Sequence, residues 1–563
     1  MKKEFTQEKK YYLSLGYTER EADLICALTF ERPYRNDVFR AMTLSKSSRR
    51  VKMSAPMDGM MGGAPVPAAG QAMYDMCAAP SMSSPAMSAQ ANFTMMAKMP
   101  VAEAPEMVEE CESGMPNIED VRWDSYDSFE DSRIKDVANS PLSTFRTTNN
   151  TAAATVLLGN YERYTRTVHD MVRTEELLNF LEYELNAPEA ENGGLFELTA
   201  ELRRKGDKGF LFLGLAGKKT LPAKQNIVLL IDTSGSMSSK TMQIRMALAT
   251  VFARLNDGDK LSIVTYSDVD HVFINGMTKN KKHDIEYVIK QLDKMYISGC
   301  TNGSRGIETA YDIAVENFAD GGLNRVIMVT DGDLNFGVTQ NGQLKDLIEN
   351  KKKSGVYYSA IGCGLYNLQD DKLETLAKNG NGNYYVINSV KDAETVLRDR
   401  YEALVYPIAK NVKAQVEFNP AAVKGYRLLG FENRALAAED FRDDTVESEP
   451  FGSGDKCVAC YELYFGDTGR ETKPLKYGGS GENVDNASEL CTLSVRCELL
   501  DGGHAEQEFA VSAEPRFTGN LEKAFKAAEL AETLRNEKDS GLVRRALRQY
   551  AELAGYLSED EAE

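Results

Sequence analysis

The sequence has few histidines and lacks any long apolar run. Its 563 residues include only four histidines, which leaves little material for histidine-based catalysis or a histidine-rich zinc site. No stretch approaches the roughly 20 apolar residues of a membrane-spanning helix, and the N-terminus has no apolar segment of the kind that a signal peptide needs. The sequence therefore predicts a cytoplasmic protein without a transmembrane segment, and an association with the cell envelope stays open.

The nine cysteines form no dense framework, which favours a reducing compartment over a disulfide-stapled secreted domain. One close pair, Cys457 and Cys460 in "CVAC", resembles half of a zinc knuckle. It falls in a strand pattern, where three-residue spacing directs the two thiols to opposite faces. Cys491 and Cys497 are predicted to face a core, so no second pair completes a zinc site.

The charge balance is strongly acidic, with a formal net charge of −19. Such a chain repels nucleic-acid phosphates and anionic membrane surfaces. We therefore expect no nucleic-acid partner.

The first 135 residues give weaker signals. Residues 1–50 are predicted to form a small helical unit, because "TERE" fits a capping box ahead of the apolar "ADLICAL". It is either a solvated appendage or a docking module for an acidic partner. Residues 51–135 are predicted to be a disordered linker, first rich in Met, Ala and Pro and then acidic. Trp123, Tyr126 and Phe129 in its acidic part indicate either a short docking helix or a partly ordered lead-in.

Residues 221–405 alternate between strand and helix patterns. Near-continuous apolar strands separated by helices are typical of a parallel sheet that is covered on both faces. The fold class predicted for this part is therefore α/β, with a doubly wound parallel sheet. The expected strands are "IVLLI", "KLSIVTY", "HVFI", "NRVIMVT", "VYYSAI" and "NYYVI".

The flanking regions are rich in β-strand patterns. Residues 136–220 are predicted to hold an amphipathic helix in "DMVRTEELLNFLEYEL" and two strands, and residues 406–515 an antiparallel β domain. We expect the strands at 194–216 to complete a sheet with those at 411–512. Residues 516–563 are predicted to close the chain as a helical hairpin.

Oxygen-bearing side chains follow two of the apolar strands. "IVLLI" runs into Asp232, Ser234 and Ser236 in "DTSGS", and "NRVIMVT" runs into Asp331. In a doubly wound sheet these strands are neighbours, so their carboxylates should converge at the carboxyl edge. A glycine-rich loop, "SGCTNGSRG", offers Thr301. Two carboxylates, three hydroxyls and water suit a hard cation such as Mg²⁺, or Mn²⁺ or Ca²⁺, better than zinc.

Taken together, "DTSGS", the threonine of "GCTNG" and "TDGD" resemble the metal-ion-dependent adhesion site (MIDAS) of the von Willebrand factor type A (VWA) domain, a Rossmann-like fold. The resemblance implies that Asp232, Ser234 and Ser236 hold the cation and that Thr301 and Asp331 join directly or through water. It also implies an open coordination position for the Asp or Glu carboxylate of a protein partner. Asp232 by itself is explained equally well as a helix N-cap. The presence of Thr301 and Asp331 at matching positions is what favours the metal site.

The segments on either side of the VWA-like region indicate which group of VWA proteins the chain resembles. "NSPLSTFRTTNNTAAATVLLGN" is similar to the region ahead of the VWA domain in bacterial YfbK-like proteins, and "VKAQVEFNPAAVKGYRLLGFENRALAAEDF" to the uncharacterised domain behind it. The architecture implied is a VWA domain inserted between β-rich flanking segments, with helical N- and C-terminal pieces.

The function predicted from these signals is that of a non-catalytic adaptor or scaffold, which binds protein through a divalent cation. Two alternatives stay open. One is a metal-dependent phosphotransferase or phosphatase that uses Asp232 as the acceptor. The other is a structural protein whose metal only orders the loops. Some VWA proteins serve a motor ATPase, and since no phosphate-binding GxxxxGK[ST] occurs here, any such ATPase would be another chain.

Overall fold

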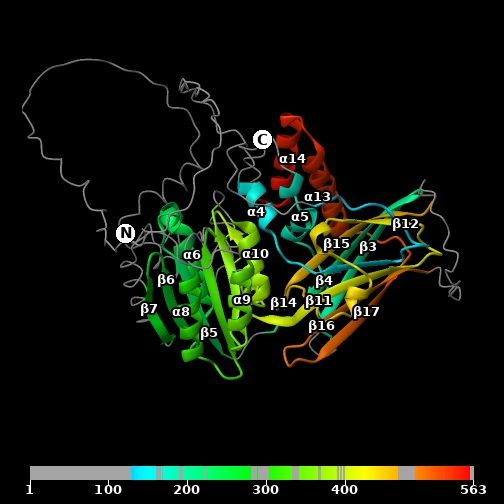
Figure 1. The fold of residues 1–563 in the computed structure, drawn as a ribbon. Helices are drawn as coiled ribbons and strands as arrows, with labels where there is room; N and C mark the ends of the chain where they lie inside the picture. Colours follow the sequence, from blue (N-terminus) through cyan, green and yellow to red (C-terminus); the bar gives the residue numbers. More distant parts are fainter. Residues whose placement is uncertain are drawn as a thin grey trace, which may run out of the picture. The chain divides into compact units, whose positions relative to one another are not determined.

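The structure is a computed structural model that describes Lys10 and most of the chain from Phe129 to Leu557 (Figure 1). The predictions for residues 1–50, and for the predicted linker as far as residue 128, therefore concern a part of the chain outside the described residues. The described ranges, apart from Lys10, are 129–159, 167, 169–188, 194–220, 224–279, 288, 303–332, 341–364, 369–389, 392, 396, 400–466 and 488–557.

A six-stranded sheet forms the α/β part of the chain. Its strand order is β10-β9-β8-β5-β6-β7, and every neighbouring pair is parallel except β6 and β7. The order reverses between β8 and β5, which confirms the doubly wound prediction. The strands are β5 (Gln225–Asp232), β6 (Lys260–Tyr266), β7 (Asp270–Thr278), β8 (Leu323–Thr330), β9 (Tyr357–Cys363) and β10 (Tyr384–Ile387).

The edge strand β7 differs from the prediction of a wholly parallel sheet, because it runs antiparallel to β6. The connection explains the difference. Strand β6 ends at Tyr266 and β7 begins at Asp270, and a link this short can only join antiparallel neighbours, whereas a parallel crossover needs a dozen or more residues.

Helices cover both faces of this sheet, as Figure 1 shows. All residues of β5 are buried, and alternate ones point to opposite faces. Val228 and Leu230 pack with one group of helices, and Ile227 and Leu229 with the other. This double cover explains why the strand is apolar without alternation. The first group is α8 (Gly303–Glu316), α9 (Asn341–Lys352) and α10 (Asp370–Asn379), and the second is α6 (Thr241–Arg254) and α12 (Tyr401–Val405).

Two further sheets form a β-sandwich. Their strand orders are β1-β12-β15-β4-β3 and β13-β2-β11-β16-β17, with β14 paired to β11, and all their pairs are antiparallel. The strands of the first are β1 (Lys135–Asp136), β3 (Phe196–Lys205), β4 (Lys208–Gly217), β12 (Gly425–Leu429) and β15 (Lys456–Tyr464). Those of the second are β2 (Leu142–Arg146), β11 (Pro407–Phe418), β13 (Ala435–Leu436), β14 (Phe451–Gly452), β16 (Glu489–Glu498) and β17 (His504–Ser512).

Each sheet of the sandwich draws strands from both sides of the α/β segment. Strand β15 pairs along its whole length with β4, and β2 pairs with β11. The expectation that the strands at 194–216 complete a sheet with later ones is thereby confirmed. Cys457 and Cys460 of β15 are both buried in separate cores, on opposite faces, as the strand spacing predicted.

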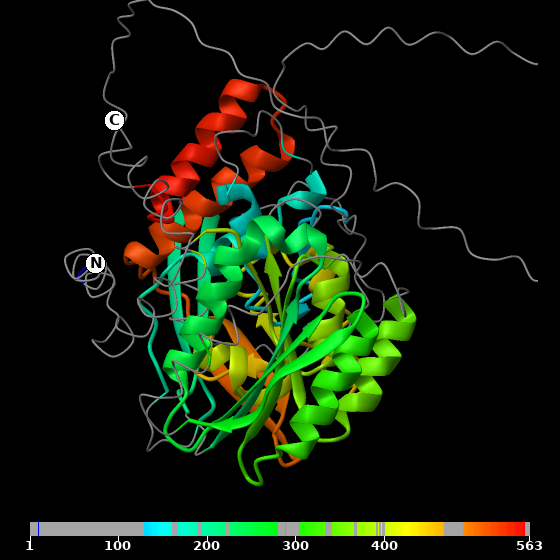
Figure 2. The same cartoon turned by 90° about the vertical axis from the view of Figure 1, so that its left-hand side faces the viewer.

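Short helices and the C-terminal hairpin cover the outer face of the first sheet. Helix α13 (Gly519–Asn536) packs against β4 and against α14 (Ser540–Leu553), and the two helices lie side by side in Figure 2. Phe210 and Phe212 of β4 belong to this helical core, while Leu211 and Leu213 face the sandwich core. The C-terminal piece is helical, as the predicted fold class has it. Helix α4 (Ala152–Gly159) joins the same core.

The helix predicted over "DMVRTEELLNFLEYEL" is shorter than expected. A turn of 3₁₀ helix at His169–Met171 precedes α5 (Thr174–Phe180), and Leu181, directly after the helix, is already in an extended conformation. Asn179 gives the reason, because other elements take its polar groups. Its carbonyl accepts from Arg400 Nη2 at 2.8 Å, and its Oδ1 accepts from the backbone N–H of Val458 at 2.8 Å. The first bond replaces the one that this carbonyl would accept in a continuing helix, and the second ties the side chain to β15.

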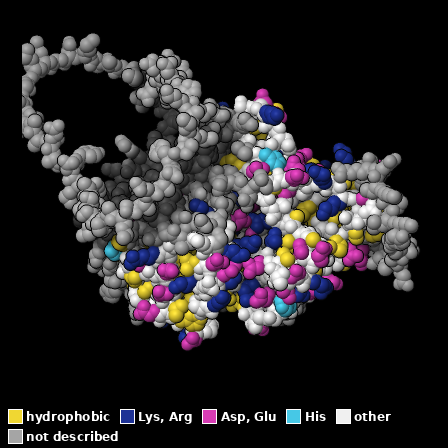
Figure 3. All heavy atoms as spheres, viewed as in Figure 1, with side chains coloured by type: hydrophobic (Ala, Val, Ile, Leu, Met, Phe, Trp, Pro, Cys, Tyr) yellow, Lys and Arg dark blue, Asp and Glu magenta, His cyan; other side chains and the backbone are white. Residues whose placement is uncertain are grey.

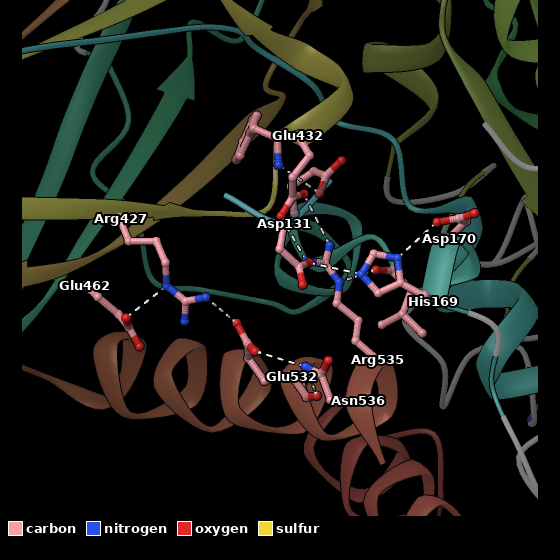
Figure 4. Close-up of polar contacts among 12 residues, drawn as sticks. Asp131, His169, Asp170, Arg427, Glu432, Glu462, Glu532, Arg535 and Asn536 are labelled. Atoms are coloured by element: carbon pink, nitrogen blue, oxygen red, sulfur yellow. Dashed lines mark hydrogen bonds and ion pairs between the residues drawn. The ribbon is translucent and has the colours of Figure 1, made fainter. Parts of the chain in front are cut away.

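The end of the acidic lead-in packs on the protein itself (Figure 4). His169 lies between two carboxylates, with Nε2 3.0 Å from Asp131 Oδ1 and Nδ1 3.0 Å from Asp170 Oδ1. Arg535 of α13 donates to Asp131 at 3.2 Å, and the ring of Phe129 lies against that of His169 at a tilt of 40°. Residues 129–134 are thus an ordered lead-in without helix. Trp123 and Tyr126 lie outside the described residues.

Candidate metal centre

Two buried carboxylates lie at the carboxyl edge of the α/β sheet. Strand β5 ends at Asp232, and β8 ends at Thr330, directly before Asp331. The two strands are parallel neighbours, with Ile231 opposite Val329, so both carboxylates emerge at the same edge. Both residues are fully buried. The structure therefore brings Asp232 and Asp331 together as the sequence predicted.

The turn after Asp232 folds back onto it. The backbone N–H of Ser234 donates to Asp232 Oδ1 at 2.9 Å, and the hydroxyls of Ser234 and Ser236 lie 3.1 Å apart. The turn continues as a 3₁₀ helix over Gly235–Lys240 and leads into α6. One local unit thus presents the oxygens of three predicted donors on the same side of the strand end.

Asp232 is held by hydrogen bonds from two strand ends. Its Oδ2 accepts from Thr330 Oγ1 at 2.7 Å and from the Tyr266 hydroxyl at 3.2 Å. With the Ser234 N–H on Oδ1, three of its roughly four acceptor sites are used, and the remaining one is on Oδ1. Burial raises the pKa of Asp232, and the charge of Asp331 adds to that rise, although the Ser234 and Thr330 hydrogen bonds oppose it. A nearby cation would favour the ionised carboxylate.

Asp331 is paired with a lysine that the sequence did not reveal as part of the site. Lys240 Nζ donates to Asp331 Oδ2 at 2.9 Å, and the lysine side chain is only 11% exposed. The backbone carbonyl of Asp331 accepts from the N–H of Gln369, which immediately precedes α10. Asp331 is therefore fixed from two sides, by the turn after β5 and by the start of α10.

Gly332 allows this close approach of α10. Its φ is +85°, and a Cβ at this position would lie 3.0 Å from the Cβ of Gln369 and 3.2 Å from Leu373 Cδ1. Only glycine adopts such a conformation without strain in so crowded a place. The glycine of "TDGD" thus lets the chain turn at the strand end while α10 packs against it.

Thr301 lies outside the described residues, so its predicted place among the ligands is untested. Helix α8 begins two residues later, at Gly303, and Gly306 on its first turn packs against Tyr266, where a Cβ would lie 2.8 Å from the Tyr266 Cβ. Tyr266 is the residue whose hydroxyl reaches Asp232. The start of α8 is therefore next to the site.

The donors fit a hard cation. The four described candidates, Asp232, Ser234, Ser236 and Asp331, offer oxygen atoms only, which is the ligand chemistry that Mg²⁺ prefers. Among the described residues, no three His, Cys, Asp or Glu side chains group as metal ligands. A cation here would therefore depend on the serine hydroxyls and on water as well as on the two carboxylates.

Sequence reasoning missed three residues that shape the site, namely Lys240, Tyr266 and Thr330. Tyr266 and Thr330 are the last residues of β6 and β8. Their position at strand ends beside β5 was the signal that could have found them. Lys240 carried no such signal, because a lysine in a turn is usually solvated.

Family models match most of the described chain. The von Willebrand factor type A domain matches residues 226–399, a model described as "Uncharacterized protein YfbK, C-terminal" matches 403–560, and one described as "von Willebrand factor" matches 120–205. "Uncharacterized protein YfbK" of Escherichia coli (strain K12) is 30% identical over 437 residues, which cover 72% of each chain. The chain belongs to the YfbK family of VWA-domain proteins. The resemblance found in the sequence is thereby confirmed.

More distant relatives match smaller shares of this YfbK-family chain, at lower identity. Inter-alpha-trypsin inhibitor heavy chain H3 of Mus musculus is 29% identical over 203 residues, 35% of this chain and 22% of that relative, so the chain spans about a fifth of its length. Among solved structures, a von Willebrand factor type A protein from Catenulispora acidiphila has 14% identity and a TM-score of 0.38, covering 65% of this chain and 88% of its own.

Proposed function

We propose that this protein is a non-catalytic adaptor that binds a protein partner through a divalent cation at the carboxyl edge of its VWA sheet. VWA domains commonly mediate protein–protein interaction. The observation that carries the proposal is the convergence of buried Asp232 and Asp331, from neighbouring strands, on a turn that presents Ser234 and Ser236.

Each ligand has a distinct part in this proposal. Asp232 contributes Oδ1, since its Oδ2 is taken by Thr330 and Tyr266. Ser234 and Ser236 contribute hydroxyls, and Asp331 and Thr301 join directly or through water. Mg²⁺, or Mn²⁺ or Ca²⁺, would supply an open coordination position for an Asp or Glu carboxylate of the partner.

A phosphotransferase built on Asp232 is the enzymatic alternative. An attacking carboxylate must reach the phosphorus with a lone pair. Asp232 is fully buried and already accepts three hydrogen bonds, which supports a ligand role over a nucleophilic one. Turnover of a generic phosphoester that disappears in Asp232→Ala would instead support the enzyme.

The partner proposed is a protein that offers an Asp or Glu carboxylate to the cation, rather than nucleic acid. The net charge is −19, and Figure 3 shows acidic and basic side chains interspersed over the visible face. None of the described helices combines the length and the apolar character needed to span a membrane. A cytoplasmic location and service to an ATPase on another chain remain predictions.

Calorimetric titration of Mg²⁺ into the full chain tests the site. We expect saturable heat from the wild type and none from Asp232→Ala. Ser236→Ala should weaken binding, while Ser238→Ala, an exposed residue of the same turn, should leave it unchanged. Equal heats from the wild type and Asp232→Ala would refute the site.

A second experiment separates adhesion from loop ordering. Once a partner is known, its binding to the wild type is measured with Mg²⁺ and with EDTA. Loss of binding in EDTA supports the adaptor. Binding that chelation leaves unchanged supports the alternative in which the metal only orders the loops.

A further inference from the structure

Lys240 is a fixed internal cation beside the candidate metal centre. Its Nζ lies 2.9 Å from Asp331 Oδ2. Its aliphatic stem packs against the end of β9, where a Cβ at Gly364 would lie 2.7 Å from Lys240 Cε. The residue sits at the end of the 3₁₀ turn that carries Ser236. A buried stem and a paired ammonium leave the side chain little freedom, unlike an ordinary surface lysine.

The charge of Lys240 changes the net charge of the site, and with it the ions that the site can bind. Asp232 and Asp331 bring two negative charges, and Lys240 offsets one of them, so these three side chains together carry −1. With a divalent cation added, the same group carries +1. Without Lys240 it would be neutral. In a buried setting, such a difference strongly affects the binding of any further ion.

We propose that Lys240 couples cation binding to the binding of an acidic partner, a role that rests on the cation site proposed above. Lys240 weakens the affinity of the site for the cation alone, because its ammonium repels a cation held by the same carboxylate. It then leaves the loaded site with a net positive charge that a partner's carboxylate neutralises. Cation and partner therefore each strengthen the binding of the other.

A purely structural role for Lys240 makes the opposite prediction. If the lysine only ties the turn after β5 to Asp331, its removal should loosen both ligands and weaken Mg²⁺ binding. The coupling role predicts tighter Mg²⁺ binding instead. The sign of the change in affinity thus separates the two.

The test uses calorimetric titration of Mg²⁺ into the full chain without partner. We expect Lys240→Met, which keeps the length of the stem, to bind Mg²⁺ at least about tenfold more tightly than the wild type, as the loss of one nearby charge implies. Lys240→Arg, which keeps the charge, should stay within about threefold of the wild type. Lys240→Gln repeats the neutral substitution, so that the result does not depend on the folding of one variant.

The same titration with a carboxylate probe tests the coupling. Sodium acetate is compared with sodium chloride at equal ionic strength. Acetate should increase the Mg²⁺ affinity of the wild type and of Lys240→Arg. It should increase the Mg²⁺ affinity of Lys240→Met by a smaller factor.

The outcomes of the two hypotheses can be told apart. Equal heats from the wild type and Asp232→Ala would overturn the cation site itself. If the wild type binds Mg²⁺ and Asp232→Ala does not, the site stands. In that case, Mg²⁺ binding by Lys240→Met and Lys240→Gln that is no tighter than by the wild type would overturn the role of Lys240 alone.

Discussion

Single residues at the carboxyl edge show which parts of the site a sequence can reveal. Asp232, Ser234, Ser236 and Asp331 were predictable because they follow apolar strands that must be neighbours in a doubly wound sheet. Lys240 was not, because its partner Asp331 is distant in sequence and no local pattern links a lysine in a turn to a strand end. Side-chain pairs of this kind are set by packing, which strand and helix periodicity does not encode.

At the scale of single residues, the contacts of His169 with Asp131 and Asp170 depend on pH. Burial alone would lower its pKa, but its hydrogen bonds to Asp170 and Asp131 outweigh burial and raise the pKa above the ordinary 6.5. The opposing charge of Arg535 is smaller. Because the folded pKa is the higher one, the stabilisation is fully present below pH 6.5 and is lost as the pH rises through the raised value.

We therefore expect His169→Gln to lower the melting temperature more at about pH 5.5 than at about pH 8. Thermal unfolding of both proteins at the two pH values measures this. His504→Gln, at an exposed histidine 3.6 Å from Asp444, serves as the control and should change little at either pH. A His169→Gln effect of the same size at both pH values would contradict the account.

At the scale of elements, a strand or a helix was predictable wherever its buried apolar residues recur at the spacing typical of that element. The six strands of the VWA sheet and the two C-terminal helices were identified from apolar spacing alone. The end of α5 was not, because Asn179 bonds to Arg400 and to the backbone of Val458, both far along the chain. Nor was the direction of β7, which the short link from β6 determines.

The turn after β8, against which the start of α10 packs, depends on Gly332. Alanine there must hold a φ of +85° and also crowd Gln369 and Leu373. We expect Gly332→Ala to lower the free energy of unfolding by about 1–3 kcal/mol from the backbone conformation alone, and by more because of the crowding. Urea unfolding measures the change.

Gly502 provides a matched control for that substitution. Its φ is +88°, and a Cβ there would meet nothing within 4 Å. Gly502→Ala should therefore show the backbone cost without the crowding. Equal losses of stability in the two variants would show that the contact between Gly332 and α10 contributes nothing.

At the scale of the whole molecule, a buried ionic cluster joins the VWA domain to the sandwich. Arg434 lies 2.6 Å from Glu374 of α10, is also bonded to Glu449, and is 3.6 Å from Glu175 of α5. Arg173 adds a second cation 3.6 Å from Glu374. The cluster thus links three regions that are far apart in sequence.

The pKa of Glu374 shows the net effect of this cluster. Burial alone would raise it, but the charges of Arg434 and Arg173 outweigh burial and lower it below the ordinary 4.5. The stabilisation is therefore present above pH 4.5 and is lost as the pH falls through the lowered value.

Replacement of Arg434 should destabilise the protein strongly, because it leaves several carboxylates buried and uncompensated. We expect Arg434→Met to lower the free energy of unfolding by about 3–5 kcal/mol, measured by urea unfolding. Arg442→Met is the control, since Arg442 is 67% exposed and pairs with Glu506 at the surface, and should cost less than about 1 kcal/mol. Similar losses in the two variants would contradict a structural role for the cluster.

The arrangement of the sandwich was only partly predictable. The pairing of the strands at 194–216 with later ones was foreseen, because two isolated strands cannot bury their apolar faces. The ionic cluster was not, since its members carry no shared pattern in sequence. The family match supports the architecture over the described chain, and the metal centre remains the central proposal.

The most direct test of that proposal is a crystal structure of the full chain soaked in Mn²⁺, with the metal located by its anomalous scattering. The account predicts a single strong peak at the carboxyl edge of the VWA sheet, within coordination distance of Asp232, Ser234 and Ser236, with Thr301 and Asp331 around it. A map with no peak there, or with Thr301 remote from the DTSGS turn, would contradict it.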